Sequence, residues 1–124
     1  MKHKWSLKKP YLMRKSDERY PRHSKQLKKD GFSDSETWAL DSVICQFILP
    51  RLIRFKEIKG GHPFGLTEPE WDDILGEMIF AFEWNISEYE EILQNLSKEE
   101  TDKNWERHKN GLELFAKHFR DLWW

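Results

Sequence analysis

The sequence predicts an all-α fold, a small helical bundle of three to four helices preceded by a basic, largely irregular N-terminal arm. Two observations predict it. After residue 32, apolar residues recur at spacings of three and four, the period of one face of an α-helix. The same part of the chain contains three capping boxes, in which a Ser or Thr is followed three residues later by Glu. We therefore divide the chain into an arm, residues 1–31, and a helical domain, residues 32–124.

The arm differs from the rest of the chain in charge. Residues 1–30 contain 11 Lys or Arg and 3 Asp or Glu, a net charge of +8, whereas the remaining residues contain 10 and 19, a net charge of −9. Pro10 and Pro21 interrupt any long helix in the arm. Its scattered aromatic residues favour an arm that docks. Such a division of charge indicates that the arm binds an anion, or packs on an acidic surface of its own chain or of a second copy.

The first predicted helix begins at a capping box, Ser33 to Glu36, and continues to Phe55. Its apolar residues cover almost the whole circumference, which predicts that this helix is the central one. Pro50 lies inside it. A proline removes one helical hydrogen bond and clashes with the preceding turn, so we expect a kink or break near residues 46–50.

Two further helices follow. Residues 60–65 contain three glycines and form the predicted connection, and the capping box from Thr67 to Glu70, with a proline in the first turn, begins the next helix. Residues 68–96 fit one long helix or two collinear ones. A capping box at Ser97 begins the last helix, whose apolar stripe steps by three and four. That stripe is Trp105, His108, Leu112, Phe115, Phe119 and Leu122.

Several classes of protein are excluded or disfavoured. A single cysteine, Cys45, forms no internal disulfide and no Cys-based zinc site. We find no phosphate-binding Gly-rich loop, nucleophile elbow or dinucleotide fingerprint, and we expect no cofactor and no metal. Lys and Arg interrupt the N-terminus where a secretory leader would be apolar, and residues 38–55 are too polar to span a membrane. We expect a cytoplasmic protein that does not bind membranes.

The best enzymatic candidate is a group of carboxylates on the second helix. Glu70, Asp73 and Glu77 are three and four residues apart and could share one face, where they could hold Mg²⁺ as in helical nucleotide pyrophosphatases. The alternative is the ordinary polar face of an amphipathic helix. The second Glu-x-x-Glu helix of that enzyme class is missing, so a non-catalytic protein is favoured.

Two arginines in the most apolar helix suggest a binding site instead. Arg51 and Arg54 need partners if they are buried, and pairing with Asp41, Glu77 or Glu83 is one explanation. The other is a phosphate-binding pocket with a Trp as stacking surface. For the histidines His62 and His108, ordinary loop or interface roles are the alternative to ligand binding. The candidate ligand-binding residues are Arg51, Arg54, Trp38, Trp71, His62, Arg14, Arg19 and Arg22.

The arm itself has two interpretations. Its Lys and Arg residues, interleaved with aromatic residues, would suit nucleic-acid phosphates and base stacking. The acidic remainder of the chain would repel nucleic acid, however, so a smaller or protein-borne anion is preferred.

Three stretches carry a resemblance: W-A-L-D at residues 38–41, F-I-L-P-R-L-x-R-F at 47–55 and W-D-x-I-L-x-x-M-I-x-A-F-E at 71–83. They resemble small uncharacterised accessory proteins of tailed bacteriophages, over about residues 32–84. The resemblance implies expression in a bacterial cytoplasm, where such proteins counter host defence by binding a protein or by sequestering a nucleotide signal.

Three functional hypotheses follow. The first is a non-catalytic, homo-oligomeric accessory protein that captures an anionic, nucleotide-like ligand. The second is an interaction protein that inhibits a host protein. The third is a Mg²⁺-dependent nucleotide hydrolase.

Overall fold

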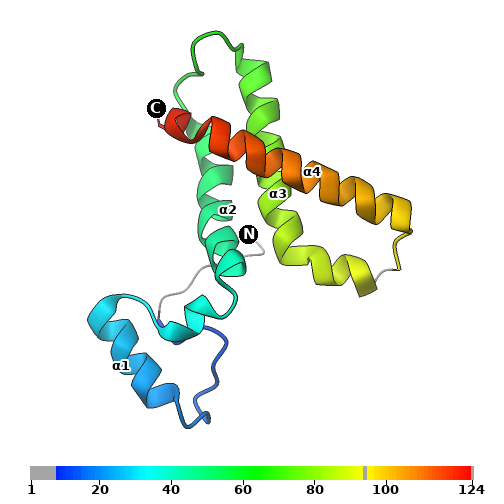
Figure 1. The fold of residues 1–124 in the computed structure, drawn as a ribbon. Coiled ribbons are helices and arrows are strands. Elements are labelled where there is room, and N and C mark those ends of the chain that lie inside the picture. The colour runs from blue at the N-terminus through cyan, green and yellow to red at the C-terminus, as the bar shows by residue number, and fades with distance from the viewer. Residues whose placement is uncertain (1–7, 94, 124) are drawn as a thin grey trace.

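The computed structural model describes residues 8–93 and 95–123, with the backbone alone over residues 88–93. Residues 1–7 of the predicted arm and Trp124 lie outside the described residues. The described part is helical and contains no strand, which confirms the all-α prediction (Figure 1). Its elements are α1 (Tyr20–Asp30), η1 (Asp34–Thr37), α2 (Leu40–Ile58), α3 (Glu68–Leu93), α4 (Lys98–Lys117) and η2 (Phe119–Asp121), where η marks a short 3-10 helix.

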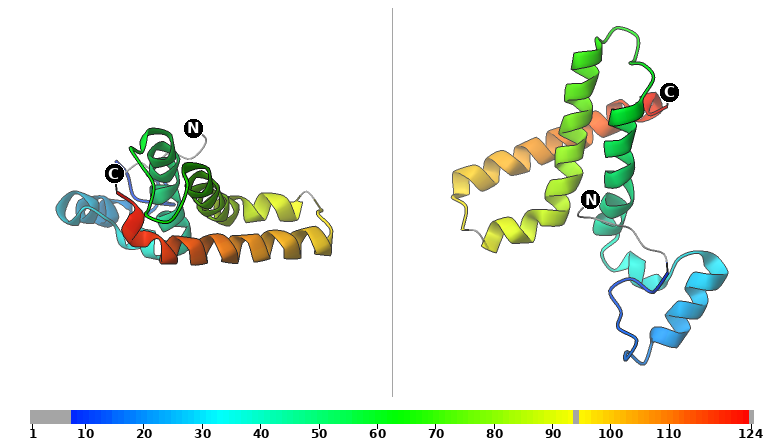
Figure 2. Two further views of the ribbon diagram at one scale, coloured as in Figure 1. Left: turned by 90° about the horizontal axis from the view of Figure 1, so that it is seen from above. Right: turned by 180° about the vertical axis from the view of Figure 1, so that it is seen from behind.

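The helices form two layers and a separate N-terminal unit. α2 and α3 lie side by side as a hairpin, and α4 crosses α3 on one face of that hairpin (Figure 2). α1 packs on η1 beside the N-terminal end of α2, away from α3 and α4 (Figure 1). No helix in the part of the chain that the structure describes is both long and apolar enough to cross a membrane.

The central helix is α3. Its residues Trp71, Leu75 and Met78 are at most 1% exposed, because one face of α3 meets α2 and another meets α4. The prediction that the helix at residues 38–55 is central is therefore wrong. Apolar residues do occur on all sides of α2, but only one face of α2 packs against α3. Ile44 and Phe47, on another face, remain 52% and 46% exposed.

Capping boxes account for the starts of α3 and α4. At α3, the Thr67 N–H donates to Glu70 Oε1 at 3.0 Å and the Glu70 N–H donates to Thr67 Oγ1 at 3.3 Å. The same reciprocal pair joins Ser97 and Glu100 at α4, at 3.4 and 3.2 Å. Each pair satisfies two amides that the helix itself cannot, which confirms both predicted starts.

The capping box at Ser33 has a different outcome. The Ser33 N–H donates to Glu36 Oε2 at 2.7 Å, but the segment that begins there is the single 3-10 turn of η1. The long helix α2 starts only at Leu40, because Ala39 adopts φ −138° and ψ 62°, outside the helical region. The predicted helix is therefore divided before residue 40, and Trp38 lies outside α2.

Two expectations about helix continuity are resolved. α2 continues through Pro50, so of the kink or break expected near residues 46–50, the break is not found. α3 is one helix of 26 residues, and it bends in its second half (Figure 1). The Ser87 hydroxyl donates to the carbonyl of Glu83 at 3.0 Å, a bond to the preceding turn of the kind that accompanies helix bending.

The arm is more ordered than the sequence predicts, since α1 is an 11-residue helix. Pro21 lies in its first turn, where a missing N–H costs nothing because that N–H has no partner inside the helix. Gly31, with φ of 83°, ends the helix and donates to the carbonyl of Leu27 at 3.0 Å. Met13 and Leu27 are buried, so this part of the arm docks as expected.

The crossing of α4 over α3 depends on Gly111. A Cβ at this position would clash with the carbonyl oxygen of Glu77 and the Cβ of Ala81, far inside van der Waals contact. At the same crossing, the Nδ1–H of the buried His108 donates to the carbonyl of Ala81 at 2.9 Å. Arg107 binds both oxygens of the Glu77 carboxylate, at 2.8 and 3.0 Å. His108 thus has the interface role considered for it.

We expect Gly111→Ala to lower the free energy of unfolding by about 1–3 kcal/mol, because the extra methyl group forces α3 and α4 apart. Gly76→Ala is the matched control. Nothing lies within 4 Å of its Cβ position in α3, so it should stabilise the protein by about 0.4–1 kcal/mol. Chemical denaturation measures both variants. Equal stability of the two would contradict the crossing described here.

Cys45 yields a second prediction. It is 6% exposed, and burial, with a smaller effect of Asp41, raises the pKa of its thiol to about 11. At about pH 8 the native protein should react with a thiol reagent at least about 100-fold more slowly than the unfolded chain, whose thiol has the ordinary pKa near 8.5. Because the folded-state pKa is raised, the stability contributed by the neutral thiol is present below about pH 9 and is lost between about 9 and 11. Labelling at equal rates would contradict this burial.

Candidate anion-binding site

The candidate site lies where the arm docks against the start of α2. The guanidinium of Arg19 is over the ring of Trp38, 5.1 Å from its centroid, and the ring of His23 meets Trp38 edge-on at 5.7 Å. His23 is only 2% exposed, whereas Trp38 is 50% exposed. The helix start at Tyr20 explains this grouping, since residues 19 and 23 are one turn apart and face the same way. Arg19 and Trp38, which the sequence proposed separately, are therefore in contact.

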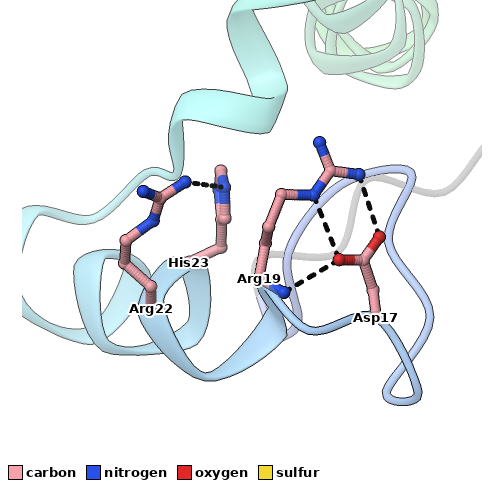
Figure 3. Close-up of polar contacts among 4 residues, drawn as sticks. All are labelled: Asp17, Arg19, Arg22 and His23. Atoms are coloured by element: carbon pink, nitrogen blue, oxygen red, sulfur yellow. Dashed lines mark hydrogen bonds and ion pairs between the residues drawn. The ribbon is translucent and has the colours of Figure 1, made fainter.

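The charge of Arg19 is already balanced. Its Nε and Nη2 donate to the two carboxylate oxygens of Asp17 at 3.0 and 2.9 Å, and its backbone N–H donates to Asp17 Oδ1 at 2.9 Å (Figure 3). These bonds to Arg19 lower the pKa of Asp17 to about 2. Asp17 is therefore ionised at any pH near neutral and balances the charge of Arg19. What Arg19 contributes to the site is its contact with the ring of Trp38, which holds that ring in place. The positive charge available to a ligand must come from other residues.

That charge lies on the outer surface of α1. Arg22, Lys25 and Lys29 follow one helical face and are exposed. Arg22 Nη2 lies 3.5 Å from Nε2 of His23 (Figure 3). Because the His23 ring contacts Trp38, this cation lies near that ring. Nδ1 of His23 is buried without a hydrogen-bond partner in the described part of the chain. Further exposed cations of the arm are Arg14, Lys15 and Lys28.

Arg51 and Arg54 do not belong to this site. Both are exposed on α2, so neither is the buried cation that the sequence suggested. The Arg51 guanidinium lies over the ring of Phe47 at 3.9 Å and donates to the Phe47 carbonyl at 2.8 Å, in the turn that contains Pro50. Arg54 pairs with Glu57 at 3.1 Å. Neither contacts the partners considered for them, because Asp41 accepts from Asn85 and Glu77 binds Arg107.

His62 and Trp71 lie at the opposite end of the α2–α3 hairpin. Both line a cavity of about 390 Å³ between the loop that connects these helices and the C-terminal η2 segment. The structure thus separates the eight candidate residues into an arm group, a pair on α2 and a pair at this cavity. The cavity also contains Gly60, Gly61, Pro63, Phe64, Asp121 and Trp123.

Sequence reasoning missed Asp17 and His23 as members of the arm site. The Asp at 17 followed by Arg at 19 was a usable signal, since an Asp two residues before a basic helix start commonly accepts local hydrogen bonds. Recognising Tyr20-Pro21 as a first helical turn would also have placed residues 19, 22 and 23 together.

Two of the three carboxylates proposed for Mg²⁺, Glu70 and Glu77, have other partners, and the third, Asp73, is exposed. Glu70 belongs to the capping box of α3, and its hydrogen bonds with Thr67 lower its pKa. Glu77 forms the ion pair with Arg107, and nearby Asp72 pairs with Lys59. Within residues 8–87 and 95–123, whose side chains the structure describes, no three His, Cys, Asp or Glu side chains are grouped as metal ligands would be.

Comparison of the chain with protein-family models, with curated proteins and with solved structures found no match.

Proposed function

We propose that this chain is a non-catalytic binding protein that captures an anionic, nucleotide-like ligand on its N-terminal unit. The observation that carries the proposal is the half-exposed ring of Trp38, held in place by Arg19 and His23 beside the exposed cations of α1. A nucleotide needs both an aromatic surface for its base and cations for its phosphates. Arg22, which lies beside His23, and the exposed Lys25 supply that charge on α1.

The charge distribution favours a small anion over nucleic acid. The +8 of residues 1–30 attracts phosphate, while the −9 of the remaining residues repels a long polyanion that extends beyond the arm. The resemblance to tailed-phage accessory proteins supports a role against host defence, in which capture alone, without chemistry, removes a nucleotide signal.

We expect titration calorimetry to detect a cyclic or linear nucleotide that binds the wild-type chain, with an affinity that falls as salt is raised. Replacing Arg22 and Lys25 together by Gln should weaken binding about tenfold or more, since two charge-assisted contacts are lost. Trp38→Leu should weaken it as well. Arg54→Gln is the control, because it removes an exposed cation of α2 outside the site. Equal affinity of all variants, or no binding of any nucleotide, would contradict the proposal.

A second candidate function is supported by the outer face of α2. Leu40, Ile44 and Phe47 follow one helical face and are 50%, 52% and 46% exposed. Monomeric proteins seldom leave such a contiguous apolar stripe uncovered. We propose that this face serves self-association of the chain or, alternatively, inhibition of a host protein.

Light scattering tests this face. We expect the wild-type chain to be a dimer or larger, and the double variant Ile44→Asp and Phe47→Asp to be a folded monomer, because charge on the face prevents its burial. Phe64→Asp is the control, since Phe64 is fully exposed in the loop between α2 and α3. A monomeric wild type would favour a host protein as the occupant of the face. An oligomer unchanged in the double variant would exclude the face from self-association.

A further inference from the structure

The cavity at the opposite end of the α2–α3 hairpin differs chemically from the arm site. Its volume of about 390 Å³ lies within the range of small-molecule sites. Trp71 is buried and lines it from α3, while Phe64 and Trp123 are its most exposed aromatic members. Gly60 and Gly61 have no side chain to offer, so the side chains of the lining are the three aromatic residues with His62, Pro63 and Asp121.

One carboxylate is fixed among these rings. The Nδ1–H of His118 donates to Asp121 Oδ2 at 2.9 Å, and the His118 ring is itself held edge-on against Trp71, with centroids 5.4 Å apart. His118 is 8% exposed, so this support is rigid. The lining contains no Lys or Arg.

The loop that forms the other wall is braced as well. The Nδ1–H of His62 donates to the carbonyl of Pro63 at 3.2 Å, and the Leu66 N–H donates to the same carbonyl at 3.2 Å. Gly65, with φ of 88°, takes the left-handed conformation that this turn requires. Phe64, which lies between these contacts, is therefore presented to solvent by an ordered turn.

We propose that this cavity is a second binding site, which takes a small organic cation with a methylated ammonium head group. Aromatic faces attract such cations through their quadrupoles, and a neighbouring carboxylate adds charge complementarity. A nucleotide phosphate would instead meet Asp121 without a compensating cation. His62 and Trp71, which the sequence analysis proposed for an anionic ligand, are thus assigned to a cationic one. This proposal is independent of the function proposed for the arm.

Choline is the probe that tests the proposal, and 3,3-dimethylbutan-1-ol, its neutral analogue with carbon in place of nitrogen, is the matched control. We expect choline to quench or shift tryptophan fluorescence saturably, with a Kd in the millimolar range, and the neutral analogue to bind about tenfold more weakly or worse. Equal binding of the two compounds, or no saturable response to choline, would overturn the proposal.

Substitutions at Asp121 and Trp123, with a control at Asp102, locate the site. Asp121→Asn keeps an acceptor for His118 but removes the charge, and it should weaken choline binding about fivefold or more. Asp102→Asn makes the same change of net charge at an exposed position of α4 outside the cavity and should have no effect. Thermal unfolding of each variant establishes that it is folded, and Trp123→Phe, which keeps a ring, should bind more tightly than Trp123→Ala. Equal affinity of Asp121→Asn and Asp102→Asn would overturn the assignment.

Two further measurements distinguish the possible sources of the ammonium group and separate this site from the arm site. Sedimentation with phosphatidylcholine vesicles distinguishes a lipid head group from free choline, since only the former carries the chain into the pellet, and either result supports the cation site. The Arg22 and Lys25 double variant should bind choline normally. Failure of nucleotide binding at the arm and failure of choline binding here are therefore separate results.

Discussion

The close contact between α3 and α4 at Gly111 is the constraint on which the rest of the fold depends. The backbone of α4 approaches the carbonyl of Glu77 and the methyl group of Ala81 so closely that no side chain fits between them. This approach brings His108 within hydrogen-bond reach of Ala81 and lets Leu114 and Phe115 pack against the core. Because α4 covers one side of α3 and α2 covers another, α3 is buried and α2 is left with a free outer face.

That arrangement separates the two ends of the molecule. The basic unit around α1 contacts the rest of the chain near the start of α2, through Trp38 and through Tyr11, whose hydroxyl accepts from Gln46 at 2.8 Å. The aromatic cavity with Asp121 lies where α2 ends, beside the end of the chain that follows α4. The two proposed sites, of opposite electrostatic character, thus lie at opposite ends of one helix, about 28 Å long at 1.5 Å per residue.

Capping chemistry made much of the fold predictable. The boxes at Thr67 and Ser97 are local and satisfy their amides whatever the rest of the chain does, so both helix starts were correct. The prediction of the central helix was wrong because the apolar content of a helix does not determine which of its faces pack against other helices. Arg51 and Arg54 were placed in a pocket on the same reasoning, and their exposure follows from the uncovered face of α2. The helical arm was missed because Pro21 was taken for a breaker, although a first turn tolerates proline.

The docking of α1 has a consequence for the energetics of binding. α1 packs on η1 and on no other helix in the described part of the chain, so its docking depends on this one contact, which includes two Gln26–Asp34 hydrogen bonds of 2.7 Å. Trp38 is positioned as a stacking surface only while Arg19 and His23 hold it. The apparent affinity for any ligand at this site therefore includes the equilibrium between docked and released arm, and the fraction docked scales it directly. In the function proposed here, the arm would set the affinity through its docked population as well as through its contacts.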